Sequence, residues 1–99
     1  MKEILENINK AFENRIRLAI MSILMVNDAI DFNALKDTLD LTDGNLASHI
    51  GVLERNSYLV VKKKFVGRKP VTTYSATVAG RRAFTGHLDA LERLIREVQ

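Results

Sequence analysis

Residues 41–75 read LTDGNLASHIGVLERNSYLVVKKKFVGRKPVTTYS, and the change of pattern within them determines the fold. Thr42 is placed to begin a helix, because its side-chain oxygen can accept a free amide of the first turn. Apolar residues then recur at helical spacing and are expected to face the core. These residues are Leu46, Ile50 and Leu53. The stretch therefore predicts a helix over residues 42–56.

The hydrophobic period changes from 3.6 to 2 after Ser57, which predicts β-strands. In the segment YLVVKKKFV, one face carries Leu59, Val61 and Phe65, and the other carries Val60, Lys62 and Lys64. We expect residues 67–70 (GRKP) to form a turn and residues 71–76 (VTTYSA) to return as a second strand. The segment 60–76 is thus predicted to be a β-hairpin with a basic tip. Lys62 and Lys64 are expected to extend its positive edge toward the helix 42–56.

Helical patterns flank this stretch on both sides. Residues 3–12 carry apolar side chains at helical spacing, and Asn14 precedes a second helical run, RIRLAIMSILMV, that is apolar over much of its circumference. Residues 29–32 (AIDF) predict a short extended piece, after which Asn33 is expected to cap a brief helix. Downstream, Thr77 is expected to cap a long helix that runs from Val78 to about Val98.

The composition is typical of one soluble globular domain, which we expect to span residues 1–99. There are no cysteines, so disulfides, thiolate metal sites and cysteine nucleophiles are excluded. No apolar run approaches the roughly 18 residues that a membrane span requires. The first residues lack the pattern of a signal peptide. A cytoplasmic protein without a cofactor or a membrane association is expected.

The charge of the chain is unevenly distributed. No acidic residue lies between Glu54 and Asp89, a segment that carries eight basic residues, although the net charge of the chain is only +3. The basic residues are Arg55, Lys62, Lys63, Lys64, Arg68, Lys69, Arg81 and Arg82. Such polarity favours a polyanionic partner. A basic face that is merely solvated is the alternative.

The order of the predicted elements indicates a winged helix-turn-helix, a mainly α fold with a small β-hairpin. In such a fold a helix enters the major groove of double-stranded DNA, and the hairpin, or wing, contacts the backbone or the minor groove. On the helix, the residues opposite the core-facing stripe, together with the cap, are Thr42, Asn45, Ser48, His49, Val52 and Arg55. On the wing, the candidate contacts are Lys62, Lys64, Arg68 and Lys69.

From about residue 14 to residue 97, the chain resembles small winged-helix transcriptional regulators related to the MarR and ArsR families. The resemblance is carried by NRIRLAIMSIL, by the stretch 41–75 and by TVAGRRAF. It implies recognition by Asn45, Ser48 and His49 and wing contacts by Arg68 and Lys69. It also implies a buried aromatic at Tyr74 and a dimer built from the terminal helices.

This sequence departs from the family pattern where a glycine usually follows the recognition helix. Ser57 stands at that position. A left-handed cap must therefore fall on Asn56 or Ser57, and asparagine tolerates that conformation better.

A homodimer is also expected from the terminal helices themselves, because both have an apolar stripe that a small core cannot easily bury. The residues of these stripes are Ile4, Leu5, Ile8, Leu88, Leu91, Ile95 and Val98, with Phe84 one turn earlier. The alternative is that the two helices pack on each other within one chain.

Two other classes of function are alternatives. A winged helix can serve as a protein–protein module without binding DNA, but the basic wing and the small polar recognition face argue against this. An enzyme would need converging groups, whereas Asp43, Ser48 and His49 are neighbours on one helix. A metal site is not expected, because His49 and His87 are isolated in the sequence. The DNA sequence, the effector and the sign of regulation are left open.

Overall fold

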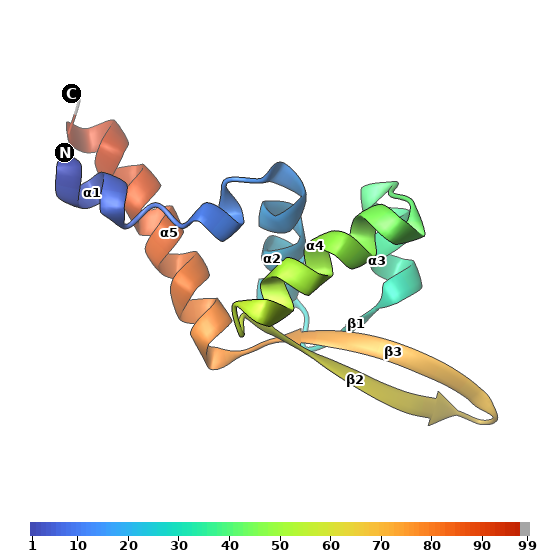
Figure 1. Ribbon diagram of the computed structural model, residues 1–99. Helices are drawn as coiled ribbons and strands as arrows, with labels where there is room; N and C mark the ends of the chain where they lie inside the picture. The colour runs from blue at the N-terminus through green and yellow to red at the C-terminus, as the bar shows by residue number, and fades with distance from the viewer. Residues whose placement is uncertain (98–99) are drawn as a thin grey trace.

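The computed structural model describes residues 1–97, which form helices around a small antiparallel sheet (Figure 1). The first elements are α1 (Lys2–Glu6), a 3-10 turn η1 (Lys10–Phe12), α2 (Arg15–Val26), β1 (Ile30–Asp31) and α3 (Phe32–Leu39). The remaining elements are α4 (Asp43–Arg55), β2 (Leu59–Val66), β3 (Lys69–Ala76) and α5 (Val78–Glu97). No described helix is both long enough and apolar enough to span a membrane.

Side-chain caps determine where the helices begin. Thr42 accepts a hydrogen bond from the amide of Asn45 at 3.2 Å, and Thr77 accepts one from the amide of Gly80 at 2.8 Å, as predicted for α4 and α5. The predicted cap Asn33 is wrong. Asp31 caps α3 instead, accepting from the amide of Ala34 at 2.7 Å, because the chain enters the helix directly from the extended backbone of β1.

The predicted continuous helix over residues 3–12 is also wrong. α1 ends at Glu6, and Asn9 has an extended backbone (φ −91°, ψ 121°) that interrupts the helix. The amide of Asn9 donates to Nδ1 of His87 at 3.0 Å, and its side chain donates to the hydroxyl of Tyr58 at 2.8 Å. These bonds to distant residues replace the local helical bonds, and apolar spacing gives no sign of them.

The sheet has the strand order β1-β3-β2, and both pairings are antiparallel. β2 and β3 pair from Leu59 and Ala76 at the base to Val66 and Lys69 at the tip. The turn is therefore only Gly67-Arg68, tighter than the predicted four-residue turn, and Gly67 supplies the positive φ of 65° that such a turn needs. Pro70 lies within β3 and faces Phe65.

The core forms between α2, α3, α4 and the base of the hairpin. Leu46, Ile50 and Leu53 of α4 are buried, which confirms the predicted inward stripe. Tyr74 is buried as expected. The left-handed residue after α4 is Ser57 (φ 62°), whereas Asn56 is right-handed, so the preference for Asn56 was wrong. Asn56 is part of the helix end: its amide donates to Val52 and its side chain to the same carbonyl.

Candidate nucleic-acid interface

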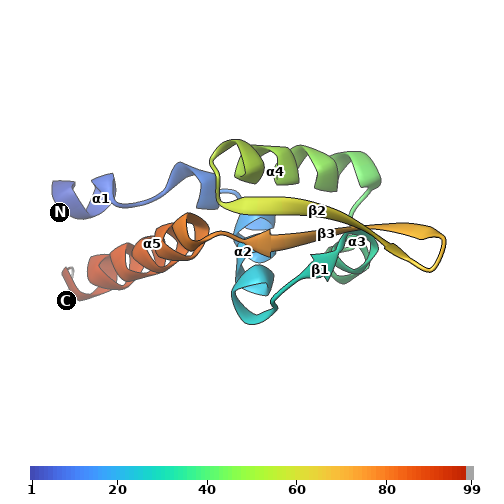
Figure 2. The same cartoon turned by 90° about the horizontal axis from the view of Figure 1, so that it is seen from below.

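α4 lies on the outside of the molecule, with the β2–β3 hairpin alongside it (Figure 2). Because one face of α4 is buried, the positions opposite are open. Asn45, Ser48 and Arg55 are exposed, while His49 and Val52 are half-buried. The predicted recognition residues thus lie on one helix, but they are not equally accessible.

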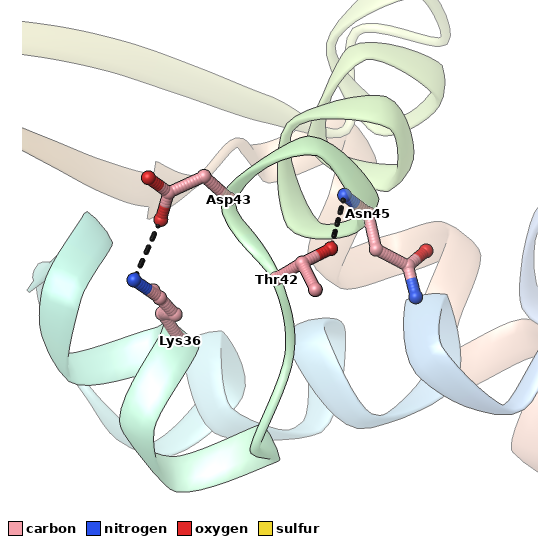
Figure 3. A network of polar contacts seen from close by, with 4 residues as sticks. All are labelled: Lys36, Thr42, Asp43 and Asn45. Carbon is pink, nitrogen blue, oxygen red and sulfur yellow. Dashed lines mark hydrogen bonds and ion pairs between the residues drawn. The ribbon is translucent and has the colours of Figure 1, made fainter.

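The N-terminal end of α4 is fixed by two polar contacts (Figure 3). Thr42 caps the helix, so its oxygen is committed to the amide of Asn45. Lys36 of α3 forms an ion pair with Asp43 at 2.8 Å, which raises the pKa of Lys36 through the hydrogen bond and the negative charge. The side-chain amide of Asn45 points away from both (Figure 3). An exposed pair of this kind adds little stability, but it links α3 to the start of α4.

His49 is held by a residue that the sequence did not single out. Nη1 of Arg17 on α2 lies 3.1 Å from Nδ1 of His49, and Nε of Arg17 donates to the carbonyl of Ala11 at 2.8 Å. A guanidinium has no acceptor, so Nδ1 of His49 accepts and Nε2 carries the proton. Desolvation and the positive charge of Arg17 lower the pKa of His49. His49 is therefore a neutral donor through Nε2.

Arg17 could not be found from sequence spacing, because it is separated from His49 by 32 residues and lies in an apolar helix. The same contacts separate the three residues of the catalytic alternative from one another. Asp43 is paired with Lys36 and Nδ1 of His49 faces Arg17, so Asp43, Ser48 and His49 do not form a relay. Residues 1–97 also contain no group of three side chains suited to hold a metal ion.

Every residue of the hairpin from 62 to 70 is exposed. Lys63 is on the face turned toward α4, because it lines a hollow together with Ala47, Gly51 and Glu54. Lys64 lines a different hollow, beside β1 and the start of α3. Side chains alternate along a strand, so Lys62 and Lys64 are on the face opposite to Lys63 and turn away from α4. The expectation that these two lysines extend the positive edge toward α4 is therefore wrong. Sequence alternation gave two faces but not which of them meets the helix.

One cation of the basic segment is bound within the protein, and a second, Arg55, lies along its own helix but stays exposed. Arg81 donates to the carbonyls of Met25 and Leu24 at 3.2 and 3.4 Å, and it thereby satisfies free carbonyls at the end of α2. The guanidinium of Arg55 lies back along α4 beside Gly51: its Nη1 is 3.2 Å from the position that a Cβ atom would occupy at Gly51. The exposed positive charge is therefore concentrated on the wing.

The terminal helices lie side by side at one end of the molecule (Figures 1 and 2). Ile4 of α1 is buried within the chain, where α1 packs on α5, so it has no surface to offer a partner. Phe84 is also buried, with its ring 5.3 Å from that of Phe12. Other predicted interface residues stay open or half-buried: Leu5, Ile8, Leu88, Leu91 and Ile95. Val98 lies outside the described residues.

The arrangement is a helix with an open polar face, a preceding helix linked to it, and a basic hairpin beside it. A family model described as a winged helix DNA-binding domain matches residues 16–95. The chain belongs to this family. The predicted winged helix fold is confirmed, and the chain is a winged-helix member of a group of DNA-binding regulators.

Relatives support the same assignment. An uncharacterized protein of Methanocaldococcus jannaschii is 31% identical over 90 residues, which cover 91% of this chain and 98% of that protein. The structure of a transcriptional regulator homologue from Pyrococcus horikoshii OT3 matches with a TM-score of 0.88 and 33% identity, covering 100% of this chain and 99% of that one. An ArsR family transcriptional regulator matches with a TM-score of 0.60 and 21% identity, covering 97% and 94%. The predicted resemblance to winged-helix regulators is thus confirmed, and the likeness to the ArsR family regulator shows that the two chains share this fold.

Proposed function

We propose that this winged helix protein is a homodimeric transcriptional regulator that recognises a specific sequence of double-stranded DNA. The observation that carries the proposal is the open face of α4, where Asn45 and Ser48 are exposed at its N-terminal end and the cationic hairpin lies alongside. A helix of this kind fits the major groove, where a base pair presents a distinct pattern of donors and acceptors.

Each open side chain of α4 has a definite chemistry toward a base edge. The amide of Asn45 can pair with N6 and N7 of adenine, because it supplies one donor and one acceptor in the matching geometry. Nε2 of His49 donates, so it suits an acceptor such as N7 or O6 of guanine or a phosphate oxygen. Val52 is half-buried and can contact a thymine methyl. Thr42 and Arg55, at the two ends of α4, suit backbone contacts.

The cations of the wing supply affinity that depends little on sequence. Lys62, Lys63, Lys64, Arg68 and Lys69 are exposed on one slender ribbon. Lys63 is on the face of the hairpin turned toward α4, and Arg68 is in the turn between β2 and β3. Cations in these positions contact phosphates and release condensed counterions.

The dimer is proposed from the apolar surface left on the terminal helices. Leu5, Leu88, Leu91 and Ile95 are exposed by 54%, 44%, 37% and 61% of their surfaces. Pairing two copies through this surface buries it and places two copies of α4 on one duplex, as two half-sites require.

The experiment that tests the function is selection of bound fragments from random duplex DNA by the purified protein. We expect a preferred sequence with two related halves, bound about a thousandfold or more tightly than scrambled duplex. The matched control is Thr85→Ala, at an exposed position of α5 away from α4. Recovery of random sequences only, with no preference above scrambled DNA, contradicts the proposal and favours a protein–protein module.

A further inference from the structure

The tip of the hairpin combines exposed apolar side chains with its cations. Phe65 is 74% exposed and Val66 is 61% exposed. All residues from 62 to 70 are exposed, because no other element covers this part of the hairpin. In both views the hairpin runs past α3 and the first turn of α4 (Figures 1 and 2). An aromatic ring exposed to water at the end of a projecting ribbon is typical of a surface that binds a partner.

The register shows how these side chains are presented. Phe65 faces Pro70 across the hairpin, and Val66 faces Lys69, directly before the two-residue turn Gly67-Arg68. Phe65 alternates with Lys63 and Val61, so it lies on the face of the ribbon turned toward α4. The turn adds no bulk beyond Arg68. The tip is therefore a narrow wedge with an aromatic ring on the side of the recognition helix.

Charge indicates what this wedge enters. Five of the nine residues from 62 to 70 are lysine or arginine, and no acidic residue lies between Glu54 and Asp89. Cations around an exposed ring suit a polyanionic partner that also has flat apolar surfaces: the cations bind its negative charges and the ring stacks on those surfaces. Duplex DNA has both features, because its bases stack behind the phosphates.

We propose that the wing tip inserts Phe65 between two base pairs in the minor groove beside the site of α4 and thereby kinks the DNA. This inference rests on the proposed function and deepens it. Arg68 and the lysines neutralise the phosphates that flank the opened step, while Val66 lies against the sugars. Flexible pyrimidine–purine steps unstack most easily, so the wing adds a preference for such a step at a position that α4 does not contact.

The test is energy transfer between dyes on the two ends of a short duplex that carries the selected site. The parent protein shortens the end-to-end distance, and 2-aminopurine placed at the opened step brightens. Phe65→Ala abolishes both signals and weakens binding about tenfold. Arg68→Ala weakens binding but leaves the bend of the saturated complex unchanged. Val78→Ala is the matched control, an apolar residue 68% exposed at the start of α5.

The outcomes separate this inference from the proposed function. If the parent shows no preferred DNA, the proposed function fails. If it binds its site but Phe65→Ala bends that site equally, the wedge is overturned while the proposed function stands. Binding of the parent to phosphatidylserine vesicles that depends on Phe65, without any bend in DNA, likewise overturns the wedge and assigns the tip to a membrane surface. Thermal unfolding of Phe65→Ala checks that the fold is retained, which the exposure of the ring favours.

Discussion

At the scale of single residues, burial and the contact with Arg17 together set the protonation state of His49. Nη1 of Arg17 lies 3.1 Å from Nδ1 of His49, and burial together with this positive charge lowers the pKa of the imidazole. The protein thus presents a neutral donor on α4 at pH 7, where a free histidine would be partly protonated. A residue of α2 therefore determines which nitrogen of His49 carries the proton and which acceptors His49 can bind.

We predict that Arg17→Met raises the pKa of His49 toward the ordinary histidine value, because both the charge and the hydrogen-bond donor are removed. Nitrogen NMR of the imidazoles during a pH titration measures this directly, and His87 is the internal control. In the parent, the spectrum should show an unprotonated Nδ1 on His49. A protonated Nδ1 in the parent, or an unchanged pKa in the variant, contradicts this role of Arg17.

His87 has a structural role. His87 is 3% exposed, and its Nδ1 accepts a hydrogen bond from the amide of Asn9 at 3.0 Å, which holds the N-terminal segment on α5. Burial lowers the pKa of His87, against a smaller opposing effect of Glu13. The unfolded chain therefore takes up a proton below about pH 6.5, while the folded protein resists it until lower pH. The unfolded state binds more protons in this window, so stability falls as the pH falls.

Chemical denaturation at pH 7.5 and pH 5.5 measures that slope. We expect the parent to lose stability at the lower pH and His87→Leu to lose less, while being less stable by about 1–3 kcal/mol at pH 7.5 because the amide of Asn9 loses its acceptor. Val78→Ala, at an apolar position that is 68% exposed, serves as the control because it removes no titratable group. Equal slopes in the parent and in His87→Leu rule out this part for His87.

At the scale of elements, the wing is expected to govern salt dependence. Arg68 occupies the turn, where Gly67 and the pairing of Val66 with Lys69 limit its freedom. Arg68→Ala should make the slope of log affinity against log salt shallower by about one unit for each phosphate that the wing no longer neutralises. Binding titrations at several salt concentrations measure this, and Lys2→Ala on α1 is the control for net charge. Identical slopes in the parent and in Arg68→Ala exclude a phosphate contact by the turn.

The elements that were predictable are those whose pattern is local. The structure confirms the inward stripe of α4 and the two predicted caps, because helical spacing and capping depend on residues within one turn. The stripe is Leu46, Ile50 and Leu53, and the caps are Thr42 and Thr77. The break at Asn9 was not predictable, because it is held by His87 and Tyr58, far away in the chain.

The same reasoning separates the parts of the candidate site. Its exposed residues on α4 and the wing follow from periodicity and charge. The contact of Arg17 with His49, the inward use of Arg81 and the face of Lys63 arise only when the elements pack. Ser57 shows that residue preference can also mislead. Preference alone favours Asn56 for the left-handed conformation, but Ser57 adopts it in the structure.

At the scale of the whole molecule, the helices α1 and α5 form one end and the wing projects from the other (Figure 1). This separation leaves the proposed DNA contacts and the proposed dimer interface on different surfaces. We predict that Leu91→Glu converts the dimer into a monomer without unfolding it, because a charge cannot be buried unpaired in an apolar interface. Sedimentation equilibrium reports the mass of two chains for the parent and of one chain for the variant. Val26→Glu, at an apolar position 81% exposed on α2, is the control. A parent that sediments as one chain contradicts the proposed dimer.

The most direct test compares specific and nonspecific binding in two variants, each titrated on the selected site and on scrambled duplex of equal length. Asn45→Ala should weaken binding to the selected site by about 1–3 kcal/mol and leave scrambled DNA nearly unchanged, because Asn45 reads a base edge. Arg68→Ala should weaken both complexes by similar factors, because a phosphate contact has no sequence content. The central claim, that α4 specifies and the wing supplies affinity, is contradicted if Asn45→Ala keeps the parent's ratio of specific to nonspecific affinity.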